Sequence, residues 1–313
     1  MTTTAVLFLI FNRPDTTTEV FAAIREARPA RLYVAADGPR PDRAGEAERC
    51  AEARRIATEV DWPCEVRTLF RDQNLGCRRA VSGAITWFFE HEEEGIILED
   101  DCVPHPSFFA FCGELLERYR DDRQIMCITG NNFQADMKGW PYSYYYSIFN
   151  HCWGWASWRR AWAFYDSELE GFDPTVAPRK LDRLCRVRGF GDHWARIFDR
   201  VKTGQIDSWA YIWTWTCFRH GGLTCTPRVN LVSNIGFGES GTHTTARVSP
   251  FANMETFEME QPLVPPPAKK SEATFDRYAA RNHFGIGRHT LLRRARRKLG
   301  RLARALRRES QTA

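Results

Sequence analysis

The sequence predicts an α/β fold in which helices cover both faces of a mostly parallel sheet. Apolar runs alternate with amphipathic segments through residue 130, as they do in chains built from successive β-α-β units. The first run, residues 6–11, is apolar at every position, which suits a strand buried on both faces. Polar loops follow the strands directly, and ligands bind at the carboxyl ends of the strands in such sheets.

The expected elements follow this alternation in order. We expect strands at residues 6–11, 31–36, 64–70, 95–98 and 125–128, and helices at residues 16–27, 43–60, 78–92 and 106–119. After residue 130 the periodicity weakens and Tyr and Trp become dense between residues 142 and 162. A helix at residues 208–218 is the clearest element expected in that second half.

Length and composition indicate a globular chain with appendages. Its 313 residues are 43% apolar and 27% charged, which is sufficient for a sizeable core. We expect a main domain at residues 1–245, a proline-rich linker and extension at residues 246–285, and a basic amphipathic helix at residues 286–313.

The net charge of +5 originates in the C-terminal end of the chain. Residues 288–308 carry ten Lys and Arg and no acid, so the rest of the chain is formally about −5, which is +5 minus 10. Because leucines recur along one helical face, this segment is typical of a helix that lies on an anionic membrane surface. A nucleic-acid-binding tail is one alternative and a helix that docks through its leucines is another, but we expect no nucleic-acid partner.

Two further features bear on where the protein acts. The N-terminus lacks the basic region of a secretory signal, and the apolar run that follows is too short to span a bilayer. Ten cysteines without a C-x-x-C pair favour reduced thiols over disulfides or a zinc site. We therefore expect a cytoplasmic protein, held peripherally at the inner face of the cell membrane if the tail is an anchor.

Three adjacent acids, Glu99, Asp100 and Asp101, directly follow the strand expected at residues 95–98. Neighbouring carboxylates repel one another unless a cation neutralises them. Their oxygens suit Mg²⁺ or Mn²⁺, which also bind diphosphate. A solvated acidic turn before the next helix is the alternative, but the position after the fourth strand favours a metal site.

Three more polar residues stand where strands end or helices begin. Asp37 closes the second strand, where an acid can hold a ribose hydroxyl, although Asp-Gly-Pro is also a strong turn sequence. Arg13 follows the first strand and Arg78 opens a helix, and both positions can pair with phosphate. Ordinary surface loops are the alternative for both arginines.

The stretch from residue 5 to residue 162 resembles the glycosyltransferases of the GT-A fold. It is most similar to the N-acetylglucosaminyltransferases that act on protein-linked mannose and to bacterial hemolysin-like proteins. Those enzymes share an Asn/Asp-Arg-rich turn after the first strand, an acid that closes the second strand, and a Glu-Asp-Asp form of the metal-binding D-x-D motif, followed by Pro and Phe-Phe. Residues 99–109 of this chain read E-D-D-C-V-P-H-P-S-F-F, and Trp153-Gly154-Trp155 resembles the family's Gly-Trp segment.

This resemblance implies roles for the residues already singled out. Asp101 would ligate Mn²⁺ or Mg²⁺, and Glu99 and Asp100 would contact the ribose or the sugar of the donor. Asp37 would hold uracil or ribose. The residues that would line the nucleotide pocket are Phe11, Asn12 and Arg13.

The resemblance also implies a catalytic base on the acceptor side. Residues 205–211 resemble the family's Asp-Trp region, which makes Asp207 the candidate. Asp207 is also placed to be the N-cap of the helix expected at residues 208–218, and a capping carboxylate remains a base. The competing candidates are Asp166, Glu168, Asp173, Asp192 and Glu239.

Two later segments contribute the remaining candidates. The glycine-rich residues 236–243 suit a loop that folds over a diphosphate, and His243 resembles the late histidine that completes the metal shell in many GT-A enzymes. A structural loop histidine is the alternative. Most rings between residues 142 and 162 are expected in the core, with Trp153 and Trp155 as candidate contacts to the acceptor.

These expectations describe an enzyme that transfers a sugar, with inversion, from a nucleotide-sugar to a glycan or lipid-linked acceptor. By resemblance the donor is a UDP-sugar. A sugar nucleotidyltransferase is one alternative, but it should carry a Gly-rich loop with Lys or Arg after the first strand, where this chain has Asn12-Arg13-Pro14. A non-enzymatic, membrane-active protein is the other alternative, suggested by the cationic tail.

Overall fold

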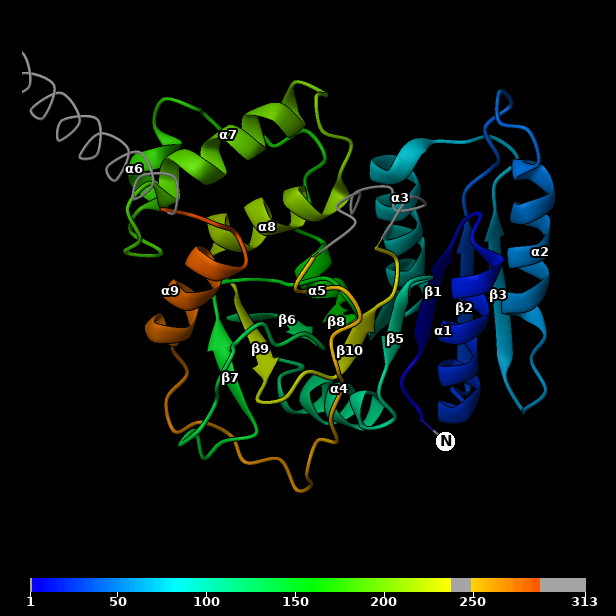
Figure 1. Cartoon of the computed structure of the whole chain (residues 1–313), viewed down its shortest axis with the longest axis horizontal. Helices are drawn as coiled ribbons and strands as arrows, with labels where there is room; N and C mark the ends of the chain where they lie inside the picture. The colour runs from blue at the N-terminus through cyan, green and yellow to red at the C-terminus, as the bar shows by residue number, and fades with distance from the viewer. Residues whose placement is uncertain (1, 238–248, 288–313) are drawn as a thin grey trace, which may run out of the picture.

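A computed structural model of the chain describes residues 2–237 and 249–287 (Figure 1). Its first half alternates strands and helices as the sequence predicts, with one additional short strand, β5. The elements are β1 (Val6–Ile10), α1 (Pro14–Ala27), β2 (Arg31–Ala36), α2 (Glu46–Thr58), β3 (Glu65–Phe70), α3 (Gly76–His91), β4 (Glu94–Glu99), β5 (Cys102–Pro104), α4 (Ser107–Arg118) and β6 (Ile125–Thr129).

The second half contains strands that the sequence did not reveal. The aromatic stretch forms two of them, and the helix expected at residues 208–218 is present as α8. The elements are β7 (Tyr144–Ser147), β8 (Trp155–Trp158), α5 (Arg159–Trp162), α6 (Ala177–Leu181), α7 (Phe190–Lys202), α8 (Trp209–His220), β9 (Leu223–Pro227), β10 (Val232–Asn234) and α9 (Ala273–Asn282).

The central sheet has eight strands in the order β3-β2-β1-β4-β8-β6-β9-β7. β1 pairs in parallel with β2 and β4, so that Val6 lies opposite both Leu32 and Ile96. β8 is inserted antiparallel between β4 and β6, and β7 closes the other edge antiparallel to β9. Since β6 and β9 run in the same direction as β1, the sheet is mostly parallel, as predicted.

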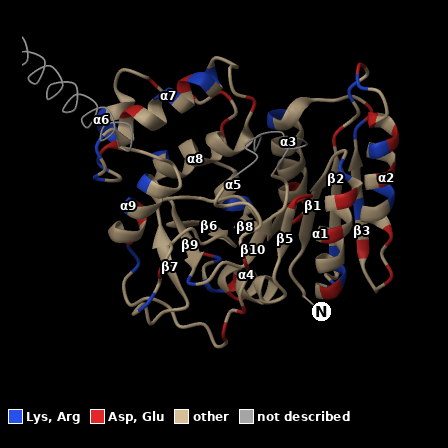
Figure 2. Cartoon of the chain, viewed as in Figure 1, with Lys and Arg blue, Asp and Glu red and all other residues tan. Residues whose placement is uncertain are grey.

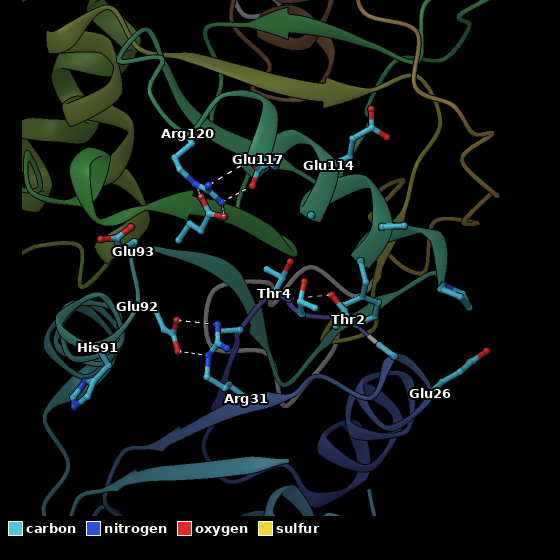
Figure 3. Close-up of a pocket in the computed structure, with 18 residues that line it drawn as sticks. Thr2, Thr4, Glu26, Arg31, His91, Glu92, Glu93, Glu114, Glu117 and Arg120 are labelled. Atoms are coloured by element: carbon cyan, nitrogen blue, oxygen red, sulfur yellow. Dashed lines mark hydrogen bonds and ion pairs between the residues drawn. The ribbon is translucent and has the colours of Figure 1, made fainter. Parts of the chain in front are cut away.

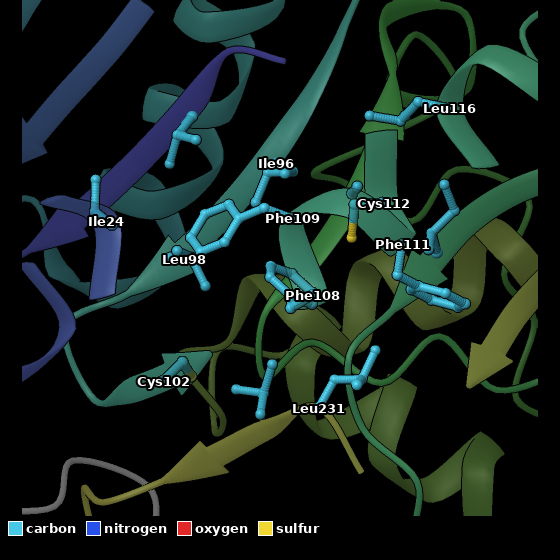
Figure 4. Packing of buried hydrophobic residues seen from close by; sticks show 14 of the residues in the cluster. Ile24, Ile96, Leu98, Cys102, Phe108, Phe109, Phe111, Cys112, Leu116 and Leu231 are labelled. Carbon is cyan, nitrogen blue, oxygen red and sulfur yellow. The ribbon is translucent and has the colours of Figure 1, made fainter. Parts of the chain in front are cut away.

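Helices cover both faces of the sheet. Successive residues of a strand point to opposite faces, so Phe8 packs in a core with α1, α2 and α4, and Leu9 packs in a second core with α3 and α8. In Figure 4, Phe108 and Phe109 of α4 face Ile96 and Leu98 of β4. All five residues of β1 are buried, which explains the unbroken apolar run.

A third packed layer covers α8 on its outer side. α6, α7 and α9 share an apolar core, rich in Phe and Trp, with α8 (Figure 1). Charged residues gather on α1 and α2, whereas β1 beside them is uncharged (Figure 2). The fold thus buries apolar surface on both sides of the sheet and leaves its carboxyl edge for polar loops.

The segment predicted to be a linker and extension folds back along the body. Tyr146 of β7 forms a β-bridge with Ser271, and Ser147 donates a 2.6 Å hydrogen bond to the buried Asp276 of α9. Val264 N–H donates to the Ser143 hydroxyl at 2.9 Å. Residues 249–287 are therefore part of the packed structure, and the predicted basic helix at residues 286–313 lies almost entirely outside the described residues.

Candidate functional site

The polar loops singled out in the sequence meet at the carboxyl edge of the sheet. β1 lies between β2 and β4, and all three strands run in the same direction. The loops that leave them begin at Phe11, Asp37 and Asp100, so these residues stand side by side at one edge. In open α/β sheets, this edge is where ligands bind.

Arg13 connects the loop after β1 to the acids after β4. Its guanidinium forms an ion pair with Asp100, and its Nη1 atom lies 3.1 Å from Asp101 Oδ2. Asp100 Oδ2 also accepts a 3.2 Å hydrogen bond from the Phe11 N–H. Asp100 is 3% exposed, so its carboxylate is not accessible to a ligand. Its role in this structure is to bind the Arg13 guanidinium and the Phe11 N–H.

One guanidinium faces three carboxyl groups at this position, so the charge is not balanced. Burial, Asp101 and Asp100 raise the pKa of Glu99 to about 8. Burial also raises the pKa of Asp100 to about 6, although Arg13 acts in the opposite direction. The cluster retains acidic groups that a further cation would stabilise in their charged form.

The Asp101 side chain is 15% exposed, whereas Asp100 is buried. Its Oδ1 atom accepts hydrogen bonds from Asn234 Nδ2 at 3.4 Å and from the Cys102 thiol at 3.3 Å. Antiparallel pairing of β5 with β10 brings Gly236 against it. A Cβ atom on Gly236 would lie 2.1 Å from Asp101 Oδ2, so only glycine fits there.

The acids fit a divalent cation that shares its coordination with a substrate. Within residues 2–237 and 249–287, no three His, Cys, Asp or Glu side chains converge to form a complete metal site. Mg²⁺ and related ions are commonly held by one or two carboxylates together with substrate phosphates. Asp101, whose side chain is partly exposed, is the residue that suits this role.

Asp37 is bound to the loop that leads into α3. Its carboxylate accepts hydrogen bonds from the N–H groups of Gly38 and Leu75 at 3.0 Å and of Gly76 at 3.1 Å. Burial raises the pKa of Asp37, whereas these N–H groups lower it. Asp37 therefore fixes the shape of residues 72–76, and a direct contact to uracil or ribose stays a prediction.

Asp207 caps a helix, but a different one from the helix that the sequence suggested. Its Oδ1 atom accepts a 3.2 Å hydrogen bond from the backbone N–H of Arg78, in the first turn of α3. The N-cap of α8 is Ser208, and it makes no side-chain capping bond. Asp207 is exposed, and its Oδ2 atom lies against Gly76, where a Cβ atom would approach it to 2.9 Å.

The thiol of Cys77 lies at the start of α3, where burial and several acids affect its pKa. Burial raises its pKa, and after burial the largest contributions come from Glu99, Asp207, Asp37 and Asp101, all of which raise it further. Cys77 belongs to the first turn of α3, whose backbone N–H groups bind Asp37 and Asp207. The sequence analysis did not single out Cys77, although its position at a helix start beside Arg78 was a usable signal.

The other residues predicted to contact the nucleotide-sugar are in contact with groups of the protein itself. The Arg78 guanidinium bonds to the Ser167 carbonyl and lies 3.6 Å from Glu168, away from the acid cluster. Asn12 donates a 3.0 Å hydrogen bond to the carboxylate of Glu46, a buried residue that the sequence analysis did not identify. The guanidinium carbon of Arg40 lies over the ring of Phe11, 5.6 Å from the ring centroid.

The structure separates the two candidate acceptor tryptophans. Trp155 is 0% exposed and stacks on Trp209 with 5.6 Å between ring centroids. It is a core residue with no face available to an acceptor, which corrects the expectation for it. Trp153 is partly exposed and lies 5.5 Å from Phe237, and His243 lies outside the described residues.

A cavity of about 1030 Å³ lies at the opposite, amino edge of the sheet (Figure 3). Its charged side chains pair largely with one another. Arg31 Nε donates to Glu92 at 2.7 Å, and Arg120 Nη2 donates to Glu94 at 2.9 Å. Because these charges are already compensated, and the acids of the carboxyl edge are absent from its lining, we do not assign the reaction to this cavity.

No family model and no curated protein sequence matches the chain. Among solved structures, the glycosyltransferase GlyE of Streptococcus pneumoniae is 10% identical with a TM-score of 0.34, covering 72% of this chain and 45% of its own. HddC from Yersinia pseudotuberculosis is 10% identical with a TM-score of 0.31, covering 50% of this chain and 77% of its own. A UDP-glucose pyrophosphorylase complexed with UDP-glucose is 12% identical with a TM-score of 0.27, covering 48% of this chain and 63% of its own.

These likenesses are too distant to carry an argument about activity. The chain spans less than two thirds of the length of GlyE and of the pyrophosphorylase. A separate observation concerns membranes: in the described ranges, no helix is long and apolar enough to cross a bilayer.

Proposed function

We propose that the chain is a glycosyltransferase of the GT-A type that transfers a sugar from a UDP-sugar to an acceptor hydroxyl. The observation that carries the proposal is the meeting of two sets of acids at one edge of the sheet: Arg13 pairs with Asp100 and Asp101, and Asp37 and Asp207 both accept hydrogen bonds from the first turn of α3. This group stands at the carboxyl edge of a mostly parallel sheet, where nucleotides bind in related architectures. The resemblance of residues 5–162 to GT-A enzymes supplies the reaction class.

The donor diphosphate is proposed to lie over Asp101 and Arg13. Mn²⁺ or Mg²⁺ held by Asp101 would neutralise the negative charge that develops on the departing diphosphate. Arg13 adds a positive charge 3.1 Å from the Asp101 carboxylate, and guanidinium groups bind phosphate oxygens well. Asp100, in turn, holds Arg13 and the Phe11 backbone in place from the buried side.

The nucleoside is proposed to lie between the loops that follow β1 and β2. The ring of Phe11 is half-buried beside Arg40, and Asn12 is fixed by the carboxylate of Glu46. Asp37 organises the facing loop through its bonds to Leu75 and Gly38. Two of these contacts are hydrogen bonds to backbone N–H groups, so the proposed pocket is preorganised. Preorganisation lowers the entropic cost of binding a ligand.

Asp207 is proposed to act as the general base. Its Oδ1 atom is bound to the Arg78 N–H, which orients the carboxylate and leaves Oδ2 to accept the proton of an acceptor hydroxyl. That hydroxyl oxygen would attack the anomeric carbon as the bond to the diphosphate breaks, which inverts the configuration. The start of the helix that orients the base is also bonded to Asp37, through the N–H group of Gly76.

A thermal-shift screen with UDP-sugars, with and without Mn²⁺, tests the proposal. A ligand at 100 times its Kd stabilises the native state by about 2.7 kcal/mol, which raises the melting temperature by several degrees. Asp101→Asn should remove the Mn²⁺-dependent part of that shift. The matched control is Asp61→Asn, because Asp61 is an exposed acid that pairs with Arg25 before β3. No Mn²⁺-dependent shift with any UDP-sugar would contradict the proposal.

A further inference from the structure

A group of aromatic rings and imidazoles lies beside Asp101, on the side away from Asp37. Asp101 follows β4, and in the sheet order β2 lies on one side of β4 while β8 and β6 lie on the other. The group comes from the ends of β6 and β10, from the turn before β8, and from the C-terminal segment. We call it the aromatic wall; its members are Phe133, His151, Trp153, Phe237, Phe251 and His283.

The rings of the wall are in direct contact. His283 stacks on Phe133, with 4.0 Å between centroids and 14° between planes. Trp153 meets Phe133 edge-on at 5.3 Å and Phe237 edge-on at 5.5 Å. The backbone N–H of Trp153 is fixed by Asn131 Oδ1 at 3.1 Å. The wall is therefore a built surface, held by contacts among four separate parts of the chain.

The wall joins the acid cluster through two short connections. Gly236, which packs against Asp101, is followed directly by Phe237. Cys152 precedes Trp153; burial raises the pKa of its thiol, and Glu99 and Asp101 raise it further. A group bound on Trp153 and Phe237 would thus lie next to a donor held at Asp101.

The chemistry of the wall suits an uncharged sugar. Burial lowers the pKa of His283 to about 4 and lowers that of His151 as well, so both imidazoles are neutral at physiological pH. Each neutral imidazole offers one donor and one acceptor, and aromatic faces attract the weakly positive C–H groups of a pyranose. His283 Nδ1 is buried and has no hydrogen-bond partner among the described residues.

An anionic group is disfavoured at the same place. The rings that contact Trp153 and His283 belong to Phe, Trp and His residues, so the wall itself provides no cation for an anionic ligand. A phosphate or carboxylate bound on the wall would also lie next to the diphosphate proposed at Asp101 and Arg13, and like charges repel. The wall therefore favours a neutral saccharide over a lipid-linked phosphate as its ligand.

We propose that the aromatic wall is the acceptor subsite and that it binds a neutral pyranose, with Trp153 and Phe237 as the stacking surface and His283 as a hydrogen-bonding residue. The proposal rests on the function proposed above, which supplies the neighbouring donor. It assigns a binding role to the C-terminal segment, because α9 carries His283 into the wall.

Saturation-transfer NMR of the full chain with simple sugars tests this subsite. The neutral probes are the methyl glycosides of glucose, galactose and mannose, and the anionic probes are glucuronic acid and inorganic phosphate. At least one neutral glycoside should bind saturably, and Trp153→Phe and His283→Ala should each weaken it by about 2- to 10-fold, the range of a single aromatic contact. Trp140→Phe is the matched control, because the Trp140 indole donates to the Tyr144 carbonyl at 3.1 Å within a separate ring cluster.

Two outcomes would overturn the inference. One is tighter binding of glucuronic acid or phosphate than of every neutral glycoside, and the other is unchanged glycoside affinity in both wall variants. Calorimetry of UDP with Mn²⁺ on the same wild-type samples separates the two proposals. If UDP binds and the glycosides do not, only the acceptor subsite is refuted; if UDP does not bind, the proposed donor chemistry is refuted.

Discussion

Replacing Gly236 by alanine should displace the Asp101 carboxylate. The added Cβ atom would lie 2.1 Å from Asp101 Oδ2 and 2.7 Å from both its Cβ and Cγ atoms. Non-bonded carbon and oxygen atoms need more than 3 Å, so the two residues would have to separate by about 1 Å. Because Asp101 Cβ is among the atoms that clash, rotating the carboxylate alone does not relieve the contact.

A displacement of this size exceeds what a metal site tolerates. Metal–ligand distances are held within about 0.2 Å, and changes to residues that position a ligand typically lower metal affinity by about 10- to 100-fold. We therefore expect Gly236→Ala to weaken Mn²⁺-dependent UDP binding by at least about tenfold in calorimetry. Overpacking should also reduce the free energy of unfolding by about 1–3 kcal/mol.

Gly113→Ala is the control for this experiment. Gly113 lies within α4, where an added Cβ atom would meet Thr4 Oγ1 at 3.2 Å, and alanine favours a helix by up to about 1 kcal/mol. This variant should keep wild-type UDP affinity. Wild-type Mn²⁺-dependent affinity in Gly236→Ala, with the fold intact by circular dichroism, would refute the placement of the cation at Asp101.

Three other substitutions test separate parts of the account. Asp207→Asn should lower turnover by about 10²- to 10⁴-fold at unchanged UDP affinity, and a capping role alone would leave turnover intact. Arg40 lowers the pKa of buried Glu46 to about 2. The lowered pKa contributes fully to the free energy of unfolding above about pH 4.5, and this contribution is lost as the pH falls toward 2. In urea unfolding, Glu46→Gln should therefore be less stable than wild type by about 1–3 kcal/mol at neutral pH, and the difference should shrink at lower pH. Trp155→Ala should cost about 3–5 kcal/mol of unfolding free energy, as for a core ring, and a small loss would contradict its assignment to the core.

The first half of the fold was predictable because its signals are local. The unbroken apolar run at Val6–Ile10 reflects a strand covered on both faces, and each expected strand and helix through residue 130 is present within a few residues. β7 and β8 escaped prediction because Tyr144–Ser147 and Trp155–Trp158 are only four residues long and each contains a serine, so they form neither an unbroken apolar run nor an alternating pattern. The antiparallel insertion of β8 between β4 and β6 depends on pairing distant in sequence, which periodicity does not reveal.

The site was predictable to the same extent. Polar residues after parallel strands indicated the edge at which Arg13, Asp37 and Asp101 meet, because parallel strands share a carboxyl edge. Contacts across the chain were not visible in advance: Asp207 caps α3 from 129 residues away, and Gly236 closes on Asp101 only through the pairing of β5 with β10. Burial of Trp155 likewise follows from its packing on Trp209, which no local pattern encodes.

The phosphorus-containing product formed from a UDP-sugar tests the central claim most directly. Wild-type protein, Mn²⁺ and a panel of UDP-hexoses and UDP-N-acetylhexosamines would be followed by ³¹P NMR, with water or an added glycoside as the acceptor. Glycosyl transfer breaks the bond between the anomeric carbon and the diphosphate, so the account predicts UDP as the product, formed without added pyrophosphate. Formation of UTP and a sugar phosphate that depends on pyrophosphate would show nucleotidyl transfer instead and would contradict the proposed function.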